Sequence, residues 1–474
     1  MTRLIHTMLH NAGGRMLAKL LLAFCLGSTV SSFAASAPGS GPTPDRKPNI
    51  VFLIADDMGY GDLGVQGDKE VRSPHIDALA ASGRRFTQYY ANHPECAPSR
   101  AALLTGVYQQ RMGFEFNPGG SGPNFGLPVD TPTMAERLKT RGYASALFGK
   151  WHQGYKPEHH PNARGFDEFY GFLGGTHPYT ADGVTQYNAT DAADARTNRL
   201  LRQNTPVDLP GHLTEALGAE ASRFIRGHKS DPFFLMLAFN APHVPMQTTR
   251  GYYQRFAHIA DEKRRIHLAM VEAMDDQVGV VLQTLKTEGL ERDTLVVFIS
   301  DNGGPVHQTT SSNYPLSGGK ATFLEGGIRV PALVCWPGTI AAGGTFDAMS
   351  SGFDLTATAL TLAGAMPALG LDGVDLMPWL TSKSSAPVHD ALYWRQGKRG
   401  AMRQGDWKLI KDAEQWRLFD LRADLAEQRD LAASEPQKLD QLRALWNNWS
   451  AQMKPPAWSP IDKPPLAAVA TQQQ

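Results

Sequence analysis

The chain has few cysteines and no excess of charge of either sign. Cys25, Cys96 and Cys335 are the only cysteines in 474 residues, which is too few for a disulfide framework. Lysine plus arginine and aspartate plus glutamate both total 46, so neither a basic surface nor nucleic-acid binding is expected. We find no internal repeat, and no apolar run reaches the ~20 residues of a membrane-spanning helix, so stable membrane insertion is not expected.

The composition is that of an enzyme-sized globular protein with long loops. Apolar residues make up 42% of the chain and charged residues 19%, with 46 glycines and 32 prolines. Residues 1–37 form a predicted secretory signal peptide, because basic residues precede a short apolar run at 20–26 and small residues follow it. A linker at 38–47 would follow, and we expect the mature protein to be secreted or periplasmic in a bacterium.

Two cysteines remain after that cleavage, and their surroundings differ. Cys335 lies in the apolar run 332–336, where a buried structural thiol is expected. Cys96 lies among Pro, Ser, Glu and Arg, which is not the composition of a core segment. Cys96 therefore calls for a chemical explanation.

Four short apolar runs end in polar or ionisable residues. The runs are rich in β-branched and aromatic residues, too short for helices, and predict buried parallel strands at 49–55, 143–148, 233–239 and 295–300. Amphipathic stretches at 213–226 and 262–286, and helix starts at Ser73 before Pro74 and Thr131 before Pro132, lie between them. Such alternation predicts an α/β fold, whose ligands bind at the carboxyl ends of the strands. The side chains at these ends should therefore converge on one site: Asp56, Asp57, Lys150, His152, His243, Asp301 and Asn302.

The pattern of expected strands and helices changes after residue 327. A helix is expected at 354–362, short antiparallel strands at 391–394 and 407–410, and a closing helix at 438–453. We predict a large domain at 48–365, a smaller C-terminal α+β subdomain with a short antiparallel sheet at 366–456, and a tail at 457–474.

The segment 96–106 reads Cys-Ala-Pro-Ser-Arg-Ala-Ala-Leu-Leu-Thr-Gly and places Cys96 at a predicted helix start, where an anion is favoured. One interpretation is a reactive thiol that pairs with a histidine in a hydrolase. The pattern also resembles the sulfatase signature, Cys-x-Pro-Ser-Arg followed by Leu-Thr-Gly, and the resemblance extends over about residues 48–431. It implies an alkaline-phosphatase-like fold with a large, mixed, mostly parallel sheet sandwiched by helices. It also implies that a formylglycine-generating maturation enzyme oxidises Cys96, and that the hydrated aldehyde attacks sulfur.

Asp56, Asp57, Asp301 and Asn302 offer only oxygen ligands, which favours Ca²⁺ or Mg²⁺ over zinc. Any one of them alone would more often form a turn or a helix cap. Their patterns, Ala-Asp-Asp-Met-Gly and Ser-Asp-Asn-Gly-Gly, resemble the sulfatase calcium site. The resemblance implies calcium rather than magnesium, with the modified Cys96 as a further ligand.

Five cationic or titratable side chains match other motifs of the same family. Arg100 closes the cysteine signature, and the others stand in Gly-Lys-Trp-His (Lys150, His152), Ala-Pro-His (His243) and Leu-Ser-Gly-Gly-Lys (Lys320). By the resemblance, Arg100 and Lys150 hold the aldehyde hydrate and His152 takes its proton. His243 and Lys320 would share sulfate binding and protonation of the leaving group.

The resemblance is strongest to the arylsulfatase A and N-acetylgalactosamine-6-sulfatase branch. It implies a sulfated carbohydrate as substrate, with aryl sulfates as surrogates, and we expect Trp394 and Arg395 at the rim of the site. One alternative is a phosphodiesterase or phosphonate monoester hydrolase of the same superfamily, because a metal-assisted anion site also suits phosphorus. A second alternative is an inactive carbohydrate-binding homologue.

Overall fold

The computed structural model describes residues 46–118, 125–181, 183–187, 198–366 and 370–458. The predicted signal peptide and most of the predicted tail lie outside these residues. No helix in the described part of the chain is long and apolar enough to cross a membrane.

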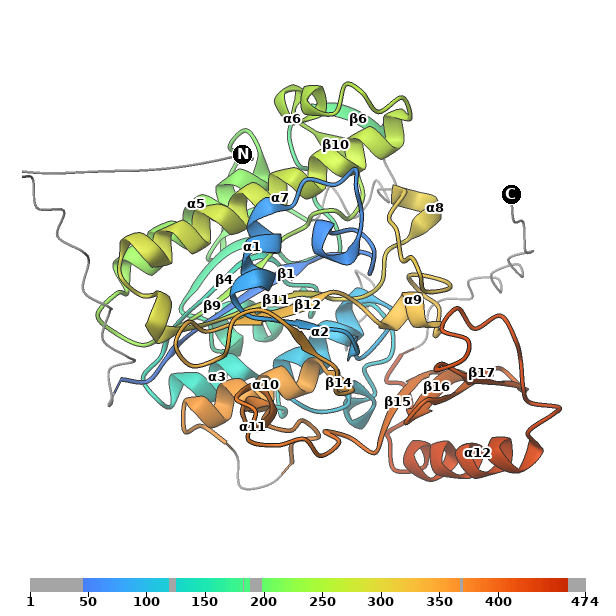
Figure 1. Cartoon of the computed structure of the whole chain (residues 1–474). Helices are drawn as coiled ribbons and strands as arrows, with labels where there is room; N and C mark the ends of the chain where they lie inside the picture. The colour runs from blue at the N-terminus through green and yellow to red at the C-terminus, as the bar shows by residue number, and fades with distance from the viewer. Residues whose placement is uncertain (1–45, 119–124, 182, 188–197, 367–369, 459–474) are drawn as a thin grey trace, which may run out of the picture. The chain divides into compact units, whose positions relative to one another are not determined.

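A ten-stranded sheet forms the centre of the fold (Figure 1). Its strands, in spatial order, are β13 (Thr345–Phe346), β2 (Arg84–Phe86), β12 (Ala332–Cys335), β11 (Thr294–Ser300), β1 (Asn49–Ala55), β9 (Phe233–Ala238), β4 (Ala144–Lys150), β5 (Glu168–Phe172), β7 (Leu201–Arg202) and β8 (Thr205–Pro206). The five strands from β11 to β5 run parallel, whereas β12, β7 and the edges next to them introduce antiparallel pairs. The predicted mixed, mostly parallel sheet is confirmed.

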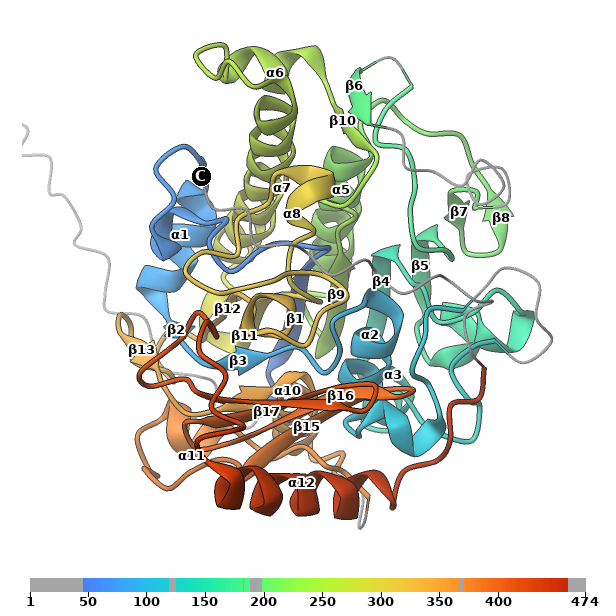
Figure 2. The ribbon, with the colours of Figure 1, turned by 90° about the vertical axis from the view of Figure 1, so that its right-hand side faces the viewer.

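Alternate residues of each central strand face opposite sides of the sheet. Both sides carry apolar residues, and a layer of helices covers each of them. Ile50, Phe52 and Ile54 of β1 pack against one layer, formed by α2 (Cys96–Thr105), α3 (Met134–Lys139) and α10 (Gly352–Leu362). Val51 and Leu53 pack against the other, formed by α1 (Pro74–Ser82), α5 (Leu213–Gly227) and α7 (Glu262–Thr287). Figure 2 shows α5 and α7 on the opposite side of β1 from α2 and α3.

A four-stranded antiparallel meander follows in the C-terminal region. It consists of β15 (Ala391–Gln396), β16 (Arg399–Gln404), β17 (Trp407–Asp412) and β18 (Gln415–Asp420). One face packs on α12 (Pro436–Ser450) through Met402, Leu409 and Trp446. The other face packs on the first part of the chain through Ile410 and other apolar residues. The predicted antiparallel sheet is confirmed, whereas the predicted domain boundary at 365 stays a prediction.

The remaining elements are short. They are α6 (Arg250–Arg255), α8 (Val306–Thr309), α9 (Glu325–Ile328), α11 (Met377–Leu380) and the strand pairs β3 (Tyr89–Tyr90) with β14 (Ser350–Ser351) and β6 (Val184–Tyr187) with β10 (Met246–Thr248).

One predicted helix start was misplaced. Helix α3 begins after Thr133, whose hydroxyl accepts the backbone N–H of Glu136 while the Glu136 carboxylate accepts that of Thr133. This reciprocal capping box outweighs the proline signal at Thr131.

Candidate active site

The polar residues that follow β1, β4, β9 and β11 meet at one edge of the sheet, because these four strands are parallel neighbours. Asp56 and Asp57 follow β1, Lys150 ends β4, and Asp301 follows β11. The Asp301 N–H donates to the carbonyl of Ala55, which ties the ends of β1 and β11 together at 3.1 Å.

Cys96 is the first residue of α2 and is 1% exposed. Its Sγ lies 3.5 Å from Asp56 Oδ1 and 3.8 Å from Asp57 Oδ1. Burial raises the pKa of this thiol above its ordinary value, and Lys150 and Lys320 only partly oppose that effect. Burial at this position therefore favours the neutral form of the thiol.

Besides Cys96, the carboxylate of Asp57 contacts Lys320, Asn302 and His243. Asp57 Oδ2 accepts a hydrogen bond of 2.7 Å from Lys320 Nζ, and Asp57 Oδ1 accepts one of 2.7 Å from Asn302 Nδ2. His243 Nε2 lies 3.4 Å from Asp57 Oδ2. Burial alone would raise the pKa of Asp57, but Lys320 and His243 outweigh burial and lower it. Asp57 also has a φ of 65°, a left-handed conformation that is uncommon for non-glycine residues.

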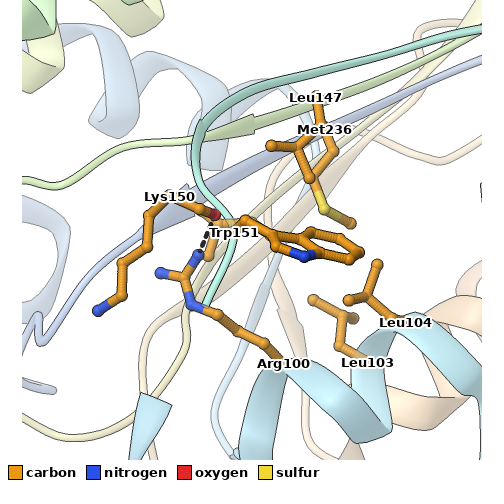
Figure 3. A pocket seen from close by; sticks show the side chains of 8 residues that line it. Arg100, Leu103, Leu104, Leu147, Lys150, Trp151 and Met236 are labelled. Carbon is orange, nitrogen blue, oxygen red and sulfur yellow. Dashed lines mark hydrogen bonds between the residues drawn. The ribbon is translucent and has the colours of Figure 1, made fainter. Parts of the chain in front are cut away.

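Arg100 and Lys150 form ion pairs at the back of the site. Lys150 Nζ lies 2.7 and 2.9 Å from the two carboxylate oxygens of Asp56, and Arg100 Nε donates to Asp301 Oδ2 at 2.8 Å. Arg100 Nη1 also donates to the Lys150 carbonyl, the dashed bond in Figure 3. Figure 3 shows both cationic groups on one side of a pocket whose other side is apolar, with Leu103, Leu104, Trp151 and Met236.

His152 lies two residues beyond β4, with a φ of 59° and a 7% exposed side chain. Burial, reinforced by the charges of Lys150 and Arg100, lowers its pKa well below the usual value, so the ring is neutral. Gly175 lies against this ring: a Cβ on Gly175 would be 2.9 Å from Cε1 and 3.0 Å from Nε2 of His152. Gln153 is fully buried and donates to the carbonyls of Ala97 and His152, so it supports the site from behind.

His243 is held by its own backbone and by a tyrosine. Its Nδ1 lies 2.7 Å from the Val244 carbonyl, so Nδ1 carries the proton and Nε2 faces Asp57. The hydroxyl of buried Tyr179 lies within hydrogen-bond distance of the carbonyls of Asn240 and His243, which share its single hydrogen. Burial and the charge of Lys320 lower the pKa of His243 to about 3.

The donor set fits a hard divalent cation. Ligand atoms of Asp56, Asp57, Cys96 and His243 lie within 4.8 Å of one another. Asn302 Oδ1 is buried and has no hydrogen-bond partner within the described residues, so it is free to bind a cation. Burial raises the pKa of Asp56 to about 7, and a cation would remove the cost of keeping this carboxylate charged. Carboxylate and amide oxygens are ligands that calcium prefers.

All ten predicted site residues therefore lie together, whereas the two expected rim residues do not. Trp394 is 1% exposed and its indole N–H donates to the Ala91 carbonyl. Arg395 is buried and pairs with Glu115 at 2.6 Å. The rim expectation was wrong because β15 turns these side chains toward the first part of the chain, where they stabilise packing.

Sequence reasoning missed the supporting residues Gly175 and Tyr179. Neither stands in a recognised motif, and each acts through a residue far away in the sequence. Tyr179 is an aromatic residue within a loop, which is the one signal that could have drawn attention to it.

The chain belongs to the sulfatase family. The family model described as Sulfatase matches residues 48–365, and one described as N-sulphoglucosamine sulphohydrolase, C-terminal, matches residues 319–452. The N-acetylgalactosamine-6-sulfatase of Mus musculus is 34% identical over 398 residues, which cover 80% of this chain and 74% of that protein. The steryl-sulfatase of Mus musculus is also 34% identical, with 79% of this chain and 71% of that protein covered.

A solved structure gives the same result. The protein in the crystal structure of Ps i-CgsB is 37% identical in sequence to this chain, and the two structures align with a TM-score of 0.81. The alignment covers 87% of this chain and 95% of the Ps i-CgsB chain. The same protein has also been solved in complex with k-i-k-neocarrahexaose. The chain is thus a sulfuric ester hydrolase with an alkaline-phosphatase-like fold.

Proposed function

We propose that this sulfatase uses a formylglycine made from Cys96 and a bound calcium ion to hydrolyse the sulfate esters of a carbohydrate. The observation that carries the proposal is the position of Cys96. Its buried, neutral thiol lies within 4 Å of two carboxylates at the start of a helix, where it is a poor nucleophile as it stands. Oxidation of this residue would resolve that mismatch.

One hydroxyl of hydrated formylglycine would attack sulfur and expel the protonated alcohol, which leaves a sulfate ester on the residue. Deprotonation of the second hydroxyl would then break the bond from this carbon to the sulfate oxygen, so that the aldehyde re-forms and sulfate leaves. Asp56, Asp57, Asp301 and Asn302 would hold the calcium ion, which would supply a Lewis acid for a sulfate oxygen. The adjoining ends of β1 and β11 bring these four side chains together, which supports the proposal.

Arg100 and Lys150 hold position 96 and balance the negative charge around it. Both cations are buried, and neighbouring carboxylates keep the pKa of each raised despite burial, so both stay charged. His152 is neutral and its Nδ1 has no hydrogen-bond partner among the described residues, so it is able to accept a proton as the general base.

His243 and Lys320 face the position of the sulfate. Lys320 stays charged because Asp57 raises its pKa against the effect of burial, so it stabilises the sulfate anion. An anionic ester beside His243 would raise the low pKa of this ring, which is the change that a general acid requires. We therefore assign the leaving-group proton to His243 and anion binding to Lys320.

A carbohydrate substrate is supported by two relatives. One is named for N-acetylgalactosamine-6-sulfate, and the other was solved with a neocarrahexaose. Aryl sulfates should serve as surrogates, since the proposed catalytic and metal-binding residues would surround the sulfate group rather than the alcohol.

Mass spectrometry of the peptide that contains Cys96 tests the proposal, after expression with a formylglycine-generating enzyme as maturation partner. We expect a mass that corresponds to the aldehyde or its hydrate, and aryl sulfate turnover that a chelator abolishes and Ca²⁺ restores. Full activity with an unmodified thiol would refute the proposal. Faster turnover of the matched aryl phosphate would favour a phosphoester hydrolase, and no turnover after full modification would favour an inactive homologue.

We also propose that the protein is secreted or periplasmic, on the basis of the sequence of residues 1–37. N-terminal sequencing of the exported protein tests this. A mature chain that starts near residue 38 is expected, whereas an intact Met1 in the cytoplasm would contradict it.

A further inference from the structure

The loop that carries Lys320 joins α8 to α9 and spans residues 310–324. The Lys320 backbone N–H donates to the Gly304 carbonyl at 3.3 Å, and the Ala321 N–H donates to the Pro94 carbonyl at 2.9 Å. Its internal turn is closed by Thr322, whose N–H and hydroxyl both donate to Gly319. The first residues of the loop are held by Asp62 and Gly304: the Ser311 hydroxyl and the Ser312 N–H donate to the Asp62 carboxylate, and Asn313 Nδ2 donates to the Gly304 carbonyl.

The C-terminal sheet and the segment after it hold the second half of this loop, from Ser317 to Glu325. Three residues before Lys320, the Ser317 hydroxyl donates to the Ala426 carbonyl and accepts from Gln428. In the middle, Arg399 of β16 donates to the Ala321 carbonyl at 3.3 Å.

At the far end of the loop, Lys408 of β17 contacts Glu325, the first residue of α9. Lys408 Nζ lies 2.8 Å from Glu325 Oε1 and 2.8 Å from Glu427 Oε1. Glu427 Oε2 in turn accepts the backbone N–H of Glu325 at 2.6 Å. Figure 1 shows α9 beside the end of the C-terminal sheet.

This ionic cluster is buried. Lys408 and Glu325 are fully buried, and Glu427 is 6% exposed. Buried ion pairs seldom add stability over apolar residues of the same volume, but some serve to fix one arrangement. The other oxygen of Glu325 accepts the Tyr90 hydroxyl at 2.6 Å, and Tyr90 ends β3 just before the segment that leads to Cys96. The Glu325 carboxylate therefore links the Lys320 loop to the Cys96 segment.

We propose that Lys408 is a positioning residue for the reaction: through Glu325 it fixes the loop that places Lys320 on the sulfate. On this proposal, the C-terminal sheet contributes to the active site through its contacts with the loop that carries Lys320. This inference rests on the proposed role of Lys320.

Lys408→Met, which keeps most of the volume and removes the charge, tests the proposal. We expect kcat/KM for an aryl sulfate to fall by about 10- to 100-fold, since a displacement of about 1 Å has effects of that size. The formylglycine content at position 96 should not change. Lys408→Arg should recover part of the activity because it keeps the charge. Lys411→Met is the matched control, since Lys411 lies on the same strand over the rings of Trp416 and Trp446, and it should leave kcat/KM unchanged.

A double-mutant cycle separates positioning from general damage. If Lys408 acts through Lys320, Lys408→Met should cause no further loss in a Lys320→Ala background. Losses that multiply, or a Lys408→Met enzyme as active as the parent, would overturn the inference. Should Lys408→Met fail to fold, Lys408→Met with Glu427→Gln removes the unpaired buried charge and takes its place in the cycle. Full activity of Lys320→Ala alone would instead show that the proposed role of Lys320 is wrong.

Discussion

Cys96 and Cys335 are both free, buried thiols, yet only Cys96 lies among charged side chains. Cys335 lies on β12 among apolar side chains, and its Sγ donates to the Ser82 carbonyl at 3.3 Å. Cys96 lies between two carboxylates and near two lysines. Burial raises the pKa of both thiols, that of Cys335 to about 11. Burial therefore does not distinguish them, and the surrounding charges do.

The largest effect is expected from removal of the proposed nucleophile. Cys96→Ala should lower kcat by at least about 10³-fold, because covalent catalysis is then lost. The fold should persist, since alanine at this position retains the helix start. Aryl sulfate turnover and circular dichroism check this, and retained turnover would show that position 96 is not the nucleophile.

A second test compares two acidic clusters. Asp57→Asn should lower kcat/KM by about 10²-fold, since it weakens cation binding and the contact with Lys320. It should also reduce the calcium retained after gel filtration. Asp276→Asn is the control: Asp276 belongs to the His75, Asp275 and Asp276 cluster and pairs with Tyr252 and Arg255. Equal calcium loss from both variants would contradict the assignment of the metal site.

A smaller effect on kcat is expected from a substitution at Gly175, which packs against the His152 ring. Gly175→Ala would place a methyl group about 3 Å from the His152 ring, and we expect kcat to fall about tenfold as the ring shifts. Gly227→Ala in α5 meets nothing within 4 Å and should leave kcat unchanged. Steady-state kinetics of both variants decide this, and equal activities would mean that the His152 ring position is not critical.

The smallest effect on activity is expected from the other thiol. Cys335→Ala should cost about 1–2 kcal/mol of unfolding free energy through the cavity it leaves. Turnover should not change. Urea denaturation measures the first and aryl sulfate kinetics the second. Loss of activity without loss of stability would reverse the assignment of the two cysteines.

The central strands were predicted almost to the residue, because each is a short apolar run that stops at a polar residue. The run 49–55 is strand β1, and 295–300 became β11 with one added residue. The run 332–336 signalled only burial, since an apolar run does not reveal whether its strand is parallel or antiparallel to its neighbour; β12 is antiparallel to β11. The short strand β5 was not predicted, although it pairs with β4.

The sequence by itself determined the types of residue at the site, because the chemistry of sulfate ester hydrolysis needs particular groups at fixed places in local motifs. Only the tertiary structure decided which other residues hold these catalytic groups in position. Lys408 and Glu325 are 83 residues apart, and Tyr179 and His243 are 64 apart. Such pairs form only when distant elements pack together. A local sequence pattern therefore cannot predict which residue will bind a given buried charge or hydroxyl.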